Sequence, residues 1–247
     1  MTNPPSAVRK VILIMGASSG IGEATALHLA TKGHRIAIGA RRTDRIAAIA
    51  REIEWLGGDV LHQALDVTDV DSVKAFAAAA LARYGRIDVL VNNASAMPLS
   101  PMAELRIDDW NRMIDVNLRG VLHGIAAVLP IMQAQGAGHF INVASTAAHR
   151  VDPAAAVYCA TKHAVRALSE GLRQQNKNLR VTVISSGITQ TEPFDGIGGP
   201  GLKGAAGAMI EQASIPASAI AEAIGYAIGQ PDAVDVNELI VRATAQR

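Results

Sequence analysis

Tyr158 and Lys162 are the pair of side chains with the clearest potential for chemistry in the sequence. They stand four residues apart in a stretch whose pattern predicts a helix over residues 156–176, and residues four apart share one helix face. A free phenol has a pKa near 10, and a neighbouring ammonium favours the phenolate and lowers that pKa. The pair could therefore give a proton to a forming alkoxide or take one from an alcohol. Taken alone, the same spacing also fits a surface contact of the lysine.

Two polar residues upstream are candidates for the same chemistry. Ser145 lies thirteen residues before Tyr158, just past a predicted strand, and Asn117 lies in the long predicted helix before that strand. Ser145 could instead cap a turn, as could Thr146 beside it. Asn117 could instead be a buried amide bonded to backbone. The sequence therefore offers Asn117, Ser145, Tyr158 and Lys162 as a candidate catalytic set.

A glycine-rich turn follows the first predicted strand and opens the first predicted helix. It reads Gly16-Ala17-Ser18-Ser19-Gly20-Ile21-Gly22. Glycine lets the backbone turn tightly and approach a pyrophosphate, while a helix N-terminus offers free N–H groups and the positive end of a dipole. Such a turn alone is a weak signal, but the strand before it and the helix after it favour a dinucleotide site. No Gly-Lys-Ser/Thr closes the motif, so a nucleoside-triphosphate loop is not predicted.

The end of the second predicted strand indicates which dinucleotide binds. An NAD site usually carries Asp or Glu there, about 20 residues past the glycines, to hold the ribose 2′-hydroxyl. This chain has Ala40 at that place, followed by Arg41 and Arg42. Arginine suits a 2′-phosphate because it forms planar, paired hydrogen bonds. We predict NADP(H), with Arg41 as the main determinant; the alternative is that both arginines only solvate a surface turn.

Short apolar runs alternate with longer amphipathic stretches along the chain. Runs of this kind predict strands that are buried on both faces of a parallel sheet, with helices between them. We therefore predict one α/β domain over residues 1–247, a doubly wound Rossmann fold with a seven-stranded parallel sheet flanked by helices. The predicted strands are 11–15, 35–39, 60–65, 89–91, 139–143, 181–185 and 239–241. The predicted helices are 21–32, 45–56, 70–84, 110–135, 156–176 and 217–229.

Residues 189–207 break this rhythm with a Gly- and Pro-rich composition. A long irregular segment in a compact domain is usually a functional lid or a disordered loop. Its place after the sixth strand puts it at the carboxyl edge of the sheet, where ligands bind in such folds. We predict that it forms a substrate loop.

Composition excludes several classes of protein. Hydrophobic residues make up 49% and charged residues 18% of the chain, which is too apolar for a disordered protein. The formal net charge is +1 without a basic stripe, so no nucleic acid partner is predicted. The seven histidines lack metal-ligand spacing, and the apolar run 11–15 is too short to span a membrane. Cys159 is the single cysteine, so a reducing compartment is expected and a cytoplasmic location fits.

The spacing Gly-x-x-x-Gly-x-Gly, together with Ser145, Tyr158 and Lys162, resembles the short-chain dehydrogenase/reductase family over nearly the whole chain. The resemblance implies hydride transfer between nicotinamide and a carbonyl/alcohol pair. Ser145 would then hydrogen-bond the substrate oxygen while Tyr158 transfers the proton. Lys162 would hold the nicotinamide ribose and lower the pKa of the tyrosine, and Asn117 would fix a water that links Lys162 to solvent.

The resemblance also implies cofactor contacts after the third, fourth and sixth strands. The residues there are Asp66 and Val67, then Asn93 and Ala94, and finally Gly187, Ile188 and Thr191. The asparagine could also simply stabilise its turn. The chain departs from the family pattern at three places, because Met15 replaces a Thr, Ser95 replaces a Gly and Ser186 replaces a Pro.

Met97-Pro98-Leu99 with His149-Arg150 further resembles the subgroup of bacterial hydroxy-acid/serine dehydrogenases and broad carbonyl reductases. That resemblance implies a small carbonyl or alcohol substrate and a homotetramer packed through the helices over 110–135 and 156–176, with a dimer as the alternative. One alternative is reduction of a carrier-bound 3-oxoacyl group, which would need a basic patch; Arg119 and Arg150 are its candidates. Another is a catalytically silent, dinucleotide-binding regulator.

Overall fold

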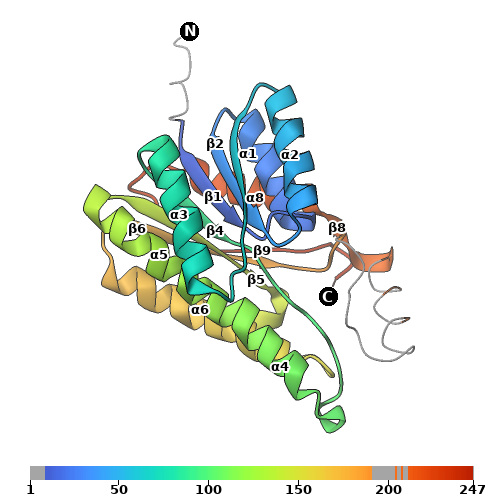
Figure 1. Cartoon of the computed structure of the whole chain (residues 1–247). Coiled ribbons are helices and arrows are strands. Elements are labelled where there is room, and N and C mark those ends of the chain that lie inside the picture. Colours follow the sequence, from blue (N-terminus) through green and yellow to red (C-terminus); the bar gives the residue numbers. More distant parts are fainter. Residues whose placement is uncertain (1–8, 191–203, 205–206, 208–210, 247) are drawn as a thin grey trace.

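A seven-stranded parallel sheet forms the centre of the molecule, with the strand order β3-β2-β1-β4-β5-β6-β9 (Figure 1). The computed structural model describes residues 9–190, 204, 207 and 211–246. The strands of the sheet are β1 (Val11–Met15), β2 (Arg35–Ala40), β3 (Asp59–Ala64), β4 (Val89–Asn92), β5 (Gly138–Ser145), β6 (Leu179–Ser186) and β9 (Glu238–Val241). The predicted seven-stranded, doubly wound sheet is thus confirmed.

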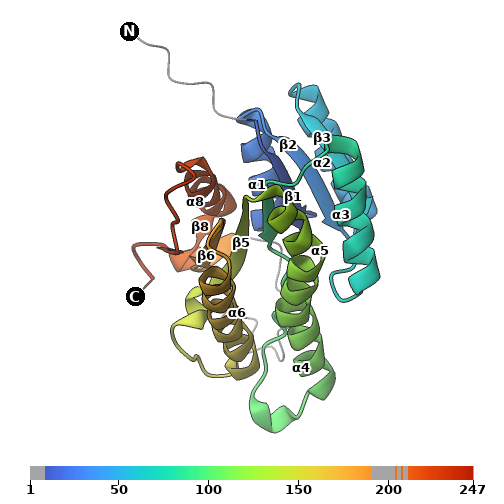
Figure 2. The same cartoon turned by 90° about the vertical axis from the view of Figure 1, so that its left-hand side faces the viewer.

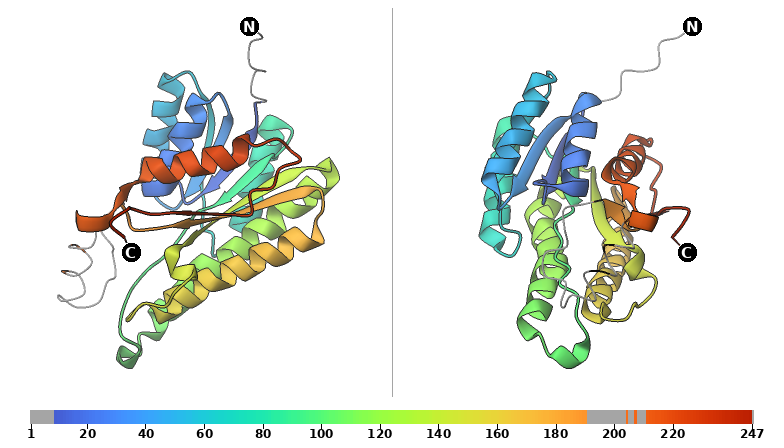
Figure 3. Two further views of the ribbon diagram at one scale, coloured as in Figure 1. Left: turned by 180° about the vertical axis from the view of Figure 1, so that it is seen from behind. Right: turned by 90° about the vertical axis from the view of Figure 1, so that its right-hand side faces the viewer.

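Helices cover both faces of this sheet, as two further views show (Figures 2 and 3). One core cluster holds apolar side chains of α1, α2 and α8, and the other holds those of α3, α5 and α6. Every residue of β1 is buried. A strand that is covered on both faces must be apolar throughout, which explains the sequence of β1. The helices are α1 (Gly20–Thr31), α2 (Thr43–Trp55), α3 (Val70–Tyr84), α4 (Ile107–Ile114), α5 (Gly120–Gln135), α6 (Ala156–Gln175) and α8 (Ala217–Gly229).

The strand order reverses direction between β1 and β4, which lie side by side. In open α/β sheets, ligands bind outside the carboxyl ends of the strands at such a point. The chain segments that leave β1, β4, β5 and β6 all emerge at this edge. The fold therefore brings the glycine-rich turn, residues 93–96, Ser145 and Gly187 to the same side of the sheet.

The long helix predicted over residues 110–135 is interrupted. A π-helical segment, η2 (Asp115–Arg119), joins α4 to α5. The apolar periodicity that predicted one helix does not reveal one extra residue in a turn. The stretch Ile107–Gln135 is long and apolar enough by composition to cross a membrane, which is weak evidence from a single helix. Its residues Val121, Val128 and Met132 pack in the core beneath the sheet.

Two short strands outside the main sheet were not predicted. β7 (Thr189–Gln190) pairs in parallel with β8 (Ile215–Pro216). Thr191 and most of the predicted substrate loop at 189–207 lie outside the described residues. The described elements also include two 3₁₀ turns, η1 (Met102–Glu104) and η3 (Thr146–Ala148).

Candidate active site

The glycine-rich turn has the backbone geometry that its composition predicts. Gly16 and Gly20 have φ values of +83° and +58°, which residues other than glycine rarely adopt. A Cβ at Gly22 would lie 2.3 Å from the carbonyl oxygen of Gly16. The turn therefore leaves the first N–H groups of α1 open to a bound anion.

The segment after β4 packs directly against this turn. The Asn93 side-chain amide donates to the Gly16 carbonyl at 2.8 Å. A Cβ at Gly16 would meet the Ala94 Cα at 2.6 Å. Asn93 and Ala94 thus hold the turn in shape, the structural role that an asparagine pair at a strand end can play.

Arg42 reaches the same turn from the second strand. Its guanidinium donates to the Ser18 hydroxyl at 3.0 and 3.1 Å and to the Ser19 hydroxyl at 2.6 Å. Ala40, where an NAD site would carry an acid, is buried at the end of β2. The structure therefore places one guanidinium and two hydroxyls together at the N-terminus of α1. Ala40 adds no carboxylate at the end of β2.

Asp66 and Val67 follow β3 at the same edge of the sheet. Burial raises the pKa of Asp66, but hydrogen bonds from the Thr68 backbone and hydroxyl and the charge of Arg41 lower it overall. Arg41 is exposed and acts on this carboxylate. Val67 is buried, and its carbonyl oxygen lies 2.8 Å from His123 Nδ1. The structure gives no contact of Asp66 or Val67 with the glycine-rich turn among the described residues.

Tyr158 stands in the first turn of α6, with Ser145 and Ser95 near its phenol. Ser145 accepts a hydrogen bond from the Ala147 backbone at 3.2 Å, so it caps η3. Burial raises the pKa of the Tyr158 phenol, and the side chains of Ser145 and Ser95 oppose that rise.

Lys162 lies one helical turn further along α6 and is 2% exposed. Its Nζ donates to the Val143 carbonyl at 3.1 Å and lies 5.6 Å from the centroid of the Tyr158 ring. Burial lowers the pKa of Lys162 to about 8. The predicted pairing on one helix face is present, but the serines, rather than Lys162, oppose the raised pKa of Tyr158. The ammonium faces inward rather than toward bulk water.

Asn117 sits in the π-helical segment and is 1% exposed. Its Oδ1 accepts from the Ala96 backbone at 2.7 Å and its Nδ2 donates to the Ala96 carbonyl at 2.8 Å. The Nδ2 also donates to the Thr161 hydroxyl at 3.2 Å. Asn117 is thus a buried amide bonded to backbone, the alternative that the sequence offered. It connects the segment after β4 to α6. Its expected link to Lys162 through a water remains a prediction.

Gly187 and Ile188 leave β6 beside the end of β5, where Ser145 pairs with Ser186. Gln246 holds this turn, because its Oε1 accepts from the Ile188 backbone at 3.0 Å. A Cβ at Gly187 would also lie 2.9 Å from the Arg242 Cα, a backbone atom that cannot easily move, which explains the glycine. Gln246 therefore supports a turn in which Ser186 stands in place of a rigid proline.

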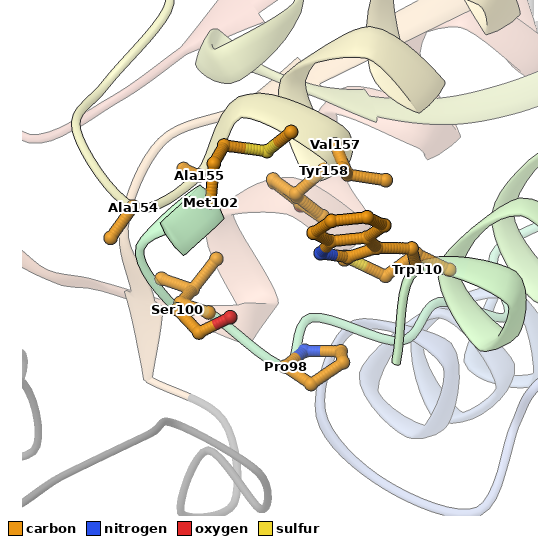
Figure 4. Close-up of a pocket in the computed structure, with 10 residues that line it drawn as sticks. Pro98, Ser100, Met102, Trp110, Ala154, Ala155, Val157 and Tyr158 are labelled. Carbon is orange, nitrogen blue, oxygen red and sulfur yellow. The ribbon is translucent and has the colours of Figure 1, made fainter. Parts of the chain in front are cut away.

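A small pocket adjoins Tyr158. Trp110 of α4 and Val157 and Tyr158 of α6 line it from one side, and Pro98, Ser100 and Met102 line it from the loop after β4 (Figure 4). The Ser100 backbone donates to the Ala154 carbonyl at 3.0 Å and joins the two loops. No charged side chain lines this pocket among the described residues.

His149, which follows η3, is bonded to the two strands at the edge of the sheet. Its Nε2 lies 3.0 Å from the Ser185 hydroxyl and 3.0 Å from Glu238 Oε1. Arg166 forms a two-pronged ion pair with the same carboxylate. These contacts anchor the segment after Ser145 to β9.

Sequence reasoning did not identify two of the residues that shape the site. Ser95 stood out only as a departure from a motif, although its hydroxyl donates to Asn117 Oδ1 at 3.2 Å and its side chain opposes the raised pKa of Tyr158. Gln246 carries no local signal, because its contacts depend on tertiary placement of the chain after β9. The remaining predicted residues are brought to one edge of the sheet, apart from Thr191, which is outside the described part.

Known proteins are similar to this chain in sequence and in fold over most of its length. The family model described as short chain dehydrogenase matches residues 10–197. An uncharacterized oxidoreductase of Staphylococcus saprophyticus is 47% identical over 242 residues, which cover 96% of this chain and 97% of that protein. An alcohol dehydrogenase of Thermococcus sibiricus, complexed with 5-hydroxy-NADP, is 34% identical with a TM-score of 0.87, covering 97% of this chain and 98% of that one. A short chain dehydrogenase/reductase of Burkholderia phymatum in complex with NAD is 25% identical with a TM-score of 0.86, covering 95% and 89%.

Proposed function

The chain belongs to the short chain dehydrogenase family, and we propose that it interconverts a carbonyl and an alcohol with NADP(H), using Tyr158 as proton donor and acceptor. One observation carries the proposal: Lys162 is buried one turn away from Tyr158 on the same helix, with its Nζ 5.6 Å from the Tyr158 ring centroid, and Ser145 lies near the phenol and opposes the rise in its pKa. A surface tyrosine–lysine contact would need neither the burial nor the serine. Its membership of this family establishes that the chain is an oxidoreductase with a nicotinamide cofactor.

The residues of the turn fit a bound dinucleotide. A Cβ at Gly16 would strike the Ala94 backbone and one at Gly22 would strike the Gly16 carbonyl, so the turn needs glycine at both places and keeps its tight shape. The N-terminus of α1 offers N–H groups to the pyrophosphate. Lys162 would hold the nicotinamide ribose, and the bound nicotinamide supplies or accepts the hydride.

The chain's own residues then manage the proton. Ser145 donates a hydrogen bond to the substrate oxygen and stabilises the charge that develops on it. Tyr158 gives its proton to that oxygen in reduction and removes it from the alcohol in oxidation. The first turn of α6 favours the phenolate, because the positive end of the helix dipole lies there. Asn117 positions both sides of the site by binding Ala96 and Thr161.

We propose Arg42 as the principal contact to the 2′-phosphate of NADP(H), with Arg41 in a supporting role. The support is the guanidinium of Arg42 on Ser18 and Ser19, compared with the effect of Arg41 on Asp66. Ala40 leaves no carboxylate at the end of β2 to repel a phosphate or to hold a ribose hydroxyl. Positive charge directly before α2 is also opposed by that helix dipole unless an anion compensates it.

Replacing Arg42 with Ala is expected to lower kcat/KM for NADPH by about tenfold to a hundredfold. A hydrogen bond to a charged group contributes about 1.5–3 kcal/mol, and about 1.4 kcal/mol is tenfold. kcat/KM for NADH should change little, because no phosphate contact is lost. Arg51→Ala, exposed two turns further along α2, is the matched control. Equal losses for both cofactors, or no loss for NADPH, would contradict the role of Arg42.

The proposed reaction is tested by NADPH oxidation over a panel of aldehydes, ketones, keto esters and 3-keto acids, with NADP reduction by the matching alcohols. We expect turnover of free small carbonyl compounds, and at least tenfold higher kcat/KM with NADPH than with NADH. The same panel includes acyl-carrier thioesters. Their preferred reduction would favour the carrier-bound alternative, but Arg119 pairs with Asp115 and Arg150 pairs with Asp152. Cofactor binding without turnover of any substrate would favour a silent regulator.

We also propose the cellular setting and assembly that the sequence predicts. Cys159 is buried and unpaired, which fits a reducing, cytoplasmic compartment. The proposed homotetramer would pack through the outer faces of α5 and α6, and Leu122 of α5 is 41% exposed. The chain would act as one dinucleotide-binding domain whose substrate loop is residues 189–207. Sedimentation analysis tests the assembly.

A further inference from the structure

Gln246 is a buried glutamine that bonds to two separate loops of the site. It is 7% exposed. Its Oε1 accepts from the Ile188 backbone at 3.0 Å, and its Nε2 donates to the Thr146 hydroxyl at 3.3 Å. A backbone N–H can only donate and a hydroxyl can accept, so these partners fix which way the amide faces. We call these two hydrogen bonds the Gln246 bridge.

The bridge joins segments that carry different parts of the proposed reaction. Thr146 directly follows Ser145, the proposed contact to the substrate oxygen. Gly187 and Ile188 are the proposed cofactor contacts after β6. In the sheet Ser145 pairs with Ser186, so both segments leave neighbouring strands at the carboxyl edge. The Gln246 bridge therefore restrains the distance between the cofactor turn and the substrate contact.

Backbone bonds hold the turn after β6 to other strands. The Gly187 N–H donates to the Val241 carbonyl at 2.7 Å, and the Ile188 carbonyl accepts from the Ile215 backbone at 3.0 Å. These bonds lead to β9 and β8 and not to the segment after β5. The proline of the family pattern, which would fix φ, is also absent from this turn. The Gln246 bridge thus supplies a restraint toward Thr146 that these backbone bonds lack.

The segment after β5 keeps other bonds when the bridge is lost. Arg166 donates to the Ala148 carbonyl at 3.2 Å, and His149 Nε2 lies 3.0 Å from Glu238 Oε1. The segment that follows Ser145 should therefore stay in place while the turn after β6 becomes freer. The glycine-rich turn, where the adenine half of the cofactor is proposed to bind, has no contact with the bridge among the described residues.

We propose that Gln246 is a positioning residue that fixes the nicotinamide end of the cofactor relative to Ser145. The inference rests on the proposed function, which places the cofactor beside the turn after β6. Hydride transfer is sensitive to such placement, because a displacement of about 1 Å at the reacting atoms can lower turnover about a hundredfold.

Gln246→Met tests this role, because it removes the amide and keeps the length of the side chain. Gln246→Glu is the conservative variant, since a carboxylate still accepts from Ile188 and can accept from the Thr146 hydroxyl. Gln230→Met is the matched control and loses an exposed hydrogen bond to the Tyr226 carbonyl. The first readout is hydrogen exchange of the Ile188 amide without cofactor. It should become about tenfold faster in Gln246→Met and stay near the wild-type rate in the other two variants.

The second readout compares the binding of two ligands. NADPH carries the nicotinamide, whereas 2′-phospho-ADP-ribose carries only the adenine half. In Gln246→Met we expect the Kd of NADPH to rise about tenfold, with kcat/KM for carbonyl reduction falling at least as much, while the Kd of 2′-phospho-ADP-ribose is unchanged. Gln246→Glu should restore these values. A role in stability alone would lower the melting temperature without separating the two ligands.

The outcomes separate this inference from the proposed function. Equal changes in Kd for both ligands, or no change for NADPH, would overturn the role of Gln246, even if the Ile188 amide exchanges faster. If the wild-type protein binds NADPH and turns over no substrate, the proposed function fails, and the two Kd values still decide the role of Gln246. Thr146→Val removes the acceptor of Nε2 from the other end of the bridge. It should give the same loss specific to NADPH, and it replaces Gln246→Met if that variant does not fold.

Discussion

Tyr158→Phe is expected to lower kcat by about 10²–10⁴-fold, the range that one positioned general acid or base contributes. The change removes the phenol hydroxyl, whose pKa Ser145 and Ser95 lower, and leaves the ring in place. Nothing in the glycine-rich turn or around Arg42 is altered. The variant should therefore bind NADPH with a Kd close to that of the wild-type protein while it loses turnover in both directions.

Steady-state kinetics and fluorescence titration of NADPH together check this expectation. The matched control is Tyr226→Phe, which removes a phenol hydroxyl from the outer face of α8, where Tyr226 is 58% exposed. A Tyr158→Phe protein that keeps more than about a tenth of kcat would contradict general acid–base catalysis by this residue. A variant that no longer binds NADPH would point instead to a lost structural contact.

Lys162→Met is expected to abolish turnover and, at the same time, to make the protein more stable. Burial lowers the pKa of Lys162 from 10.5 to about 8, which corresponds to roughly 3 kcal/mol against the charged form at neutral pH. Met removes that charge, while the lost hydrogen bond to the Val143 carbonyl costs about 1 kcal/mol. The free energy of unfolding should therefore rise by about 2 kcal/mol. The catalytic loss should be of the same order as for Tyr158→Phe.

The pH dependence of this gain has a definite sign. Between pH 8 and 10.5 the native state has released the Lys162 proton and the unfolded state still holds it, so unfolding takes up a proton. The contribution of Lys162 to the free energy of unfolding therefore rises with pH across this window, and it is lowest and constant below it. The advantage of Lys162→Met should be greatest at neutral pH and shrink toward pH 10.5. Urea unfolding of both proteins at several pH values measures it, and a variant less stable at pH 7 would contradict the argument.

Much of the fold could be predicted because its signals are local. α3 and α8 have the predicted bounds, and α3 is closed by an Asp69 cap and by Gly85 at φ +76°. Each main strand also overlaps its prediction, since buried parallel strands are short and uniformly apolar. The π-helical segment and the β7–β8 pair were not predicted. The first depends on one extra residue within a turn, and the second joins two-residue strands that are distant in the sequence.

The sequence predicted which residues form the candidate site better than it predicted the contacts between them. Spacing on one helix brought Tyr158 and Lys162 together, and turn chemistry identified the glycines. Which partner each side chain meets depends on how separate strands end at one edge of the sheet. That is why Arg42 meets Ser18 and Ser19, and why Ser95 meets Asn117, without any signal in the local sequence.

The side-chain amide of Asn117 clasps residue 96 on one side and residue 161 on the other. A mutation that shifts one of these segments therefore also shifts the other. Few substitutions in either segment should be tolerated while the enzyme changes its substrate. New substrate preferences would have to arise at positions outside the clasp, such as Met102 and Trp110, which no such bond restrains among the described residues. Laboratory evolution of altered selectivity should therefore accumulate its first successful changes there.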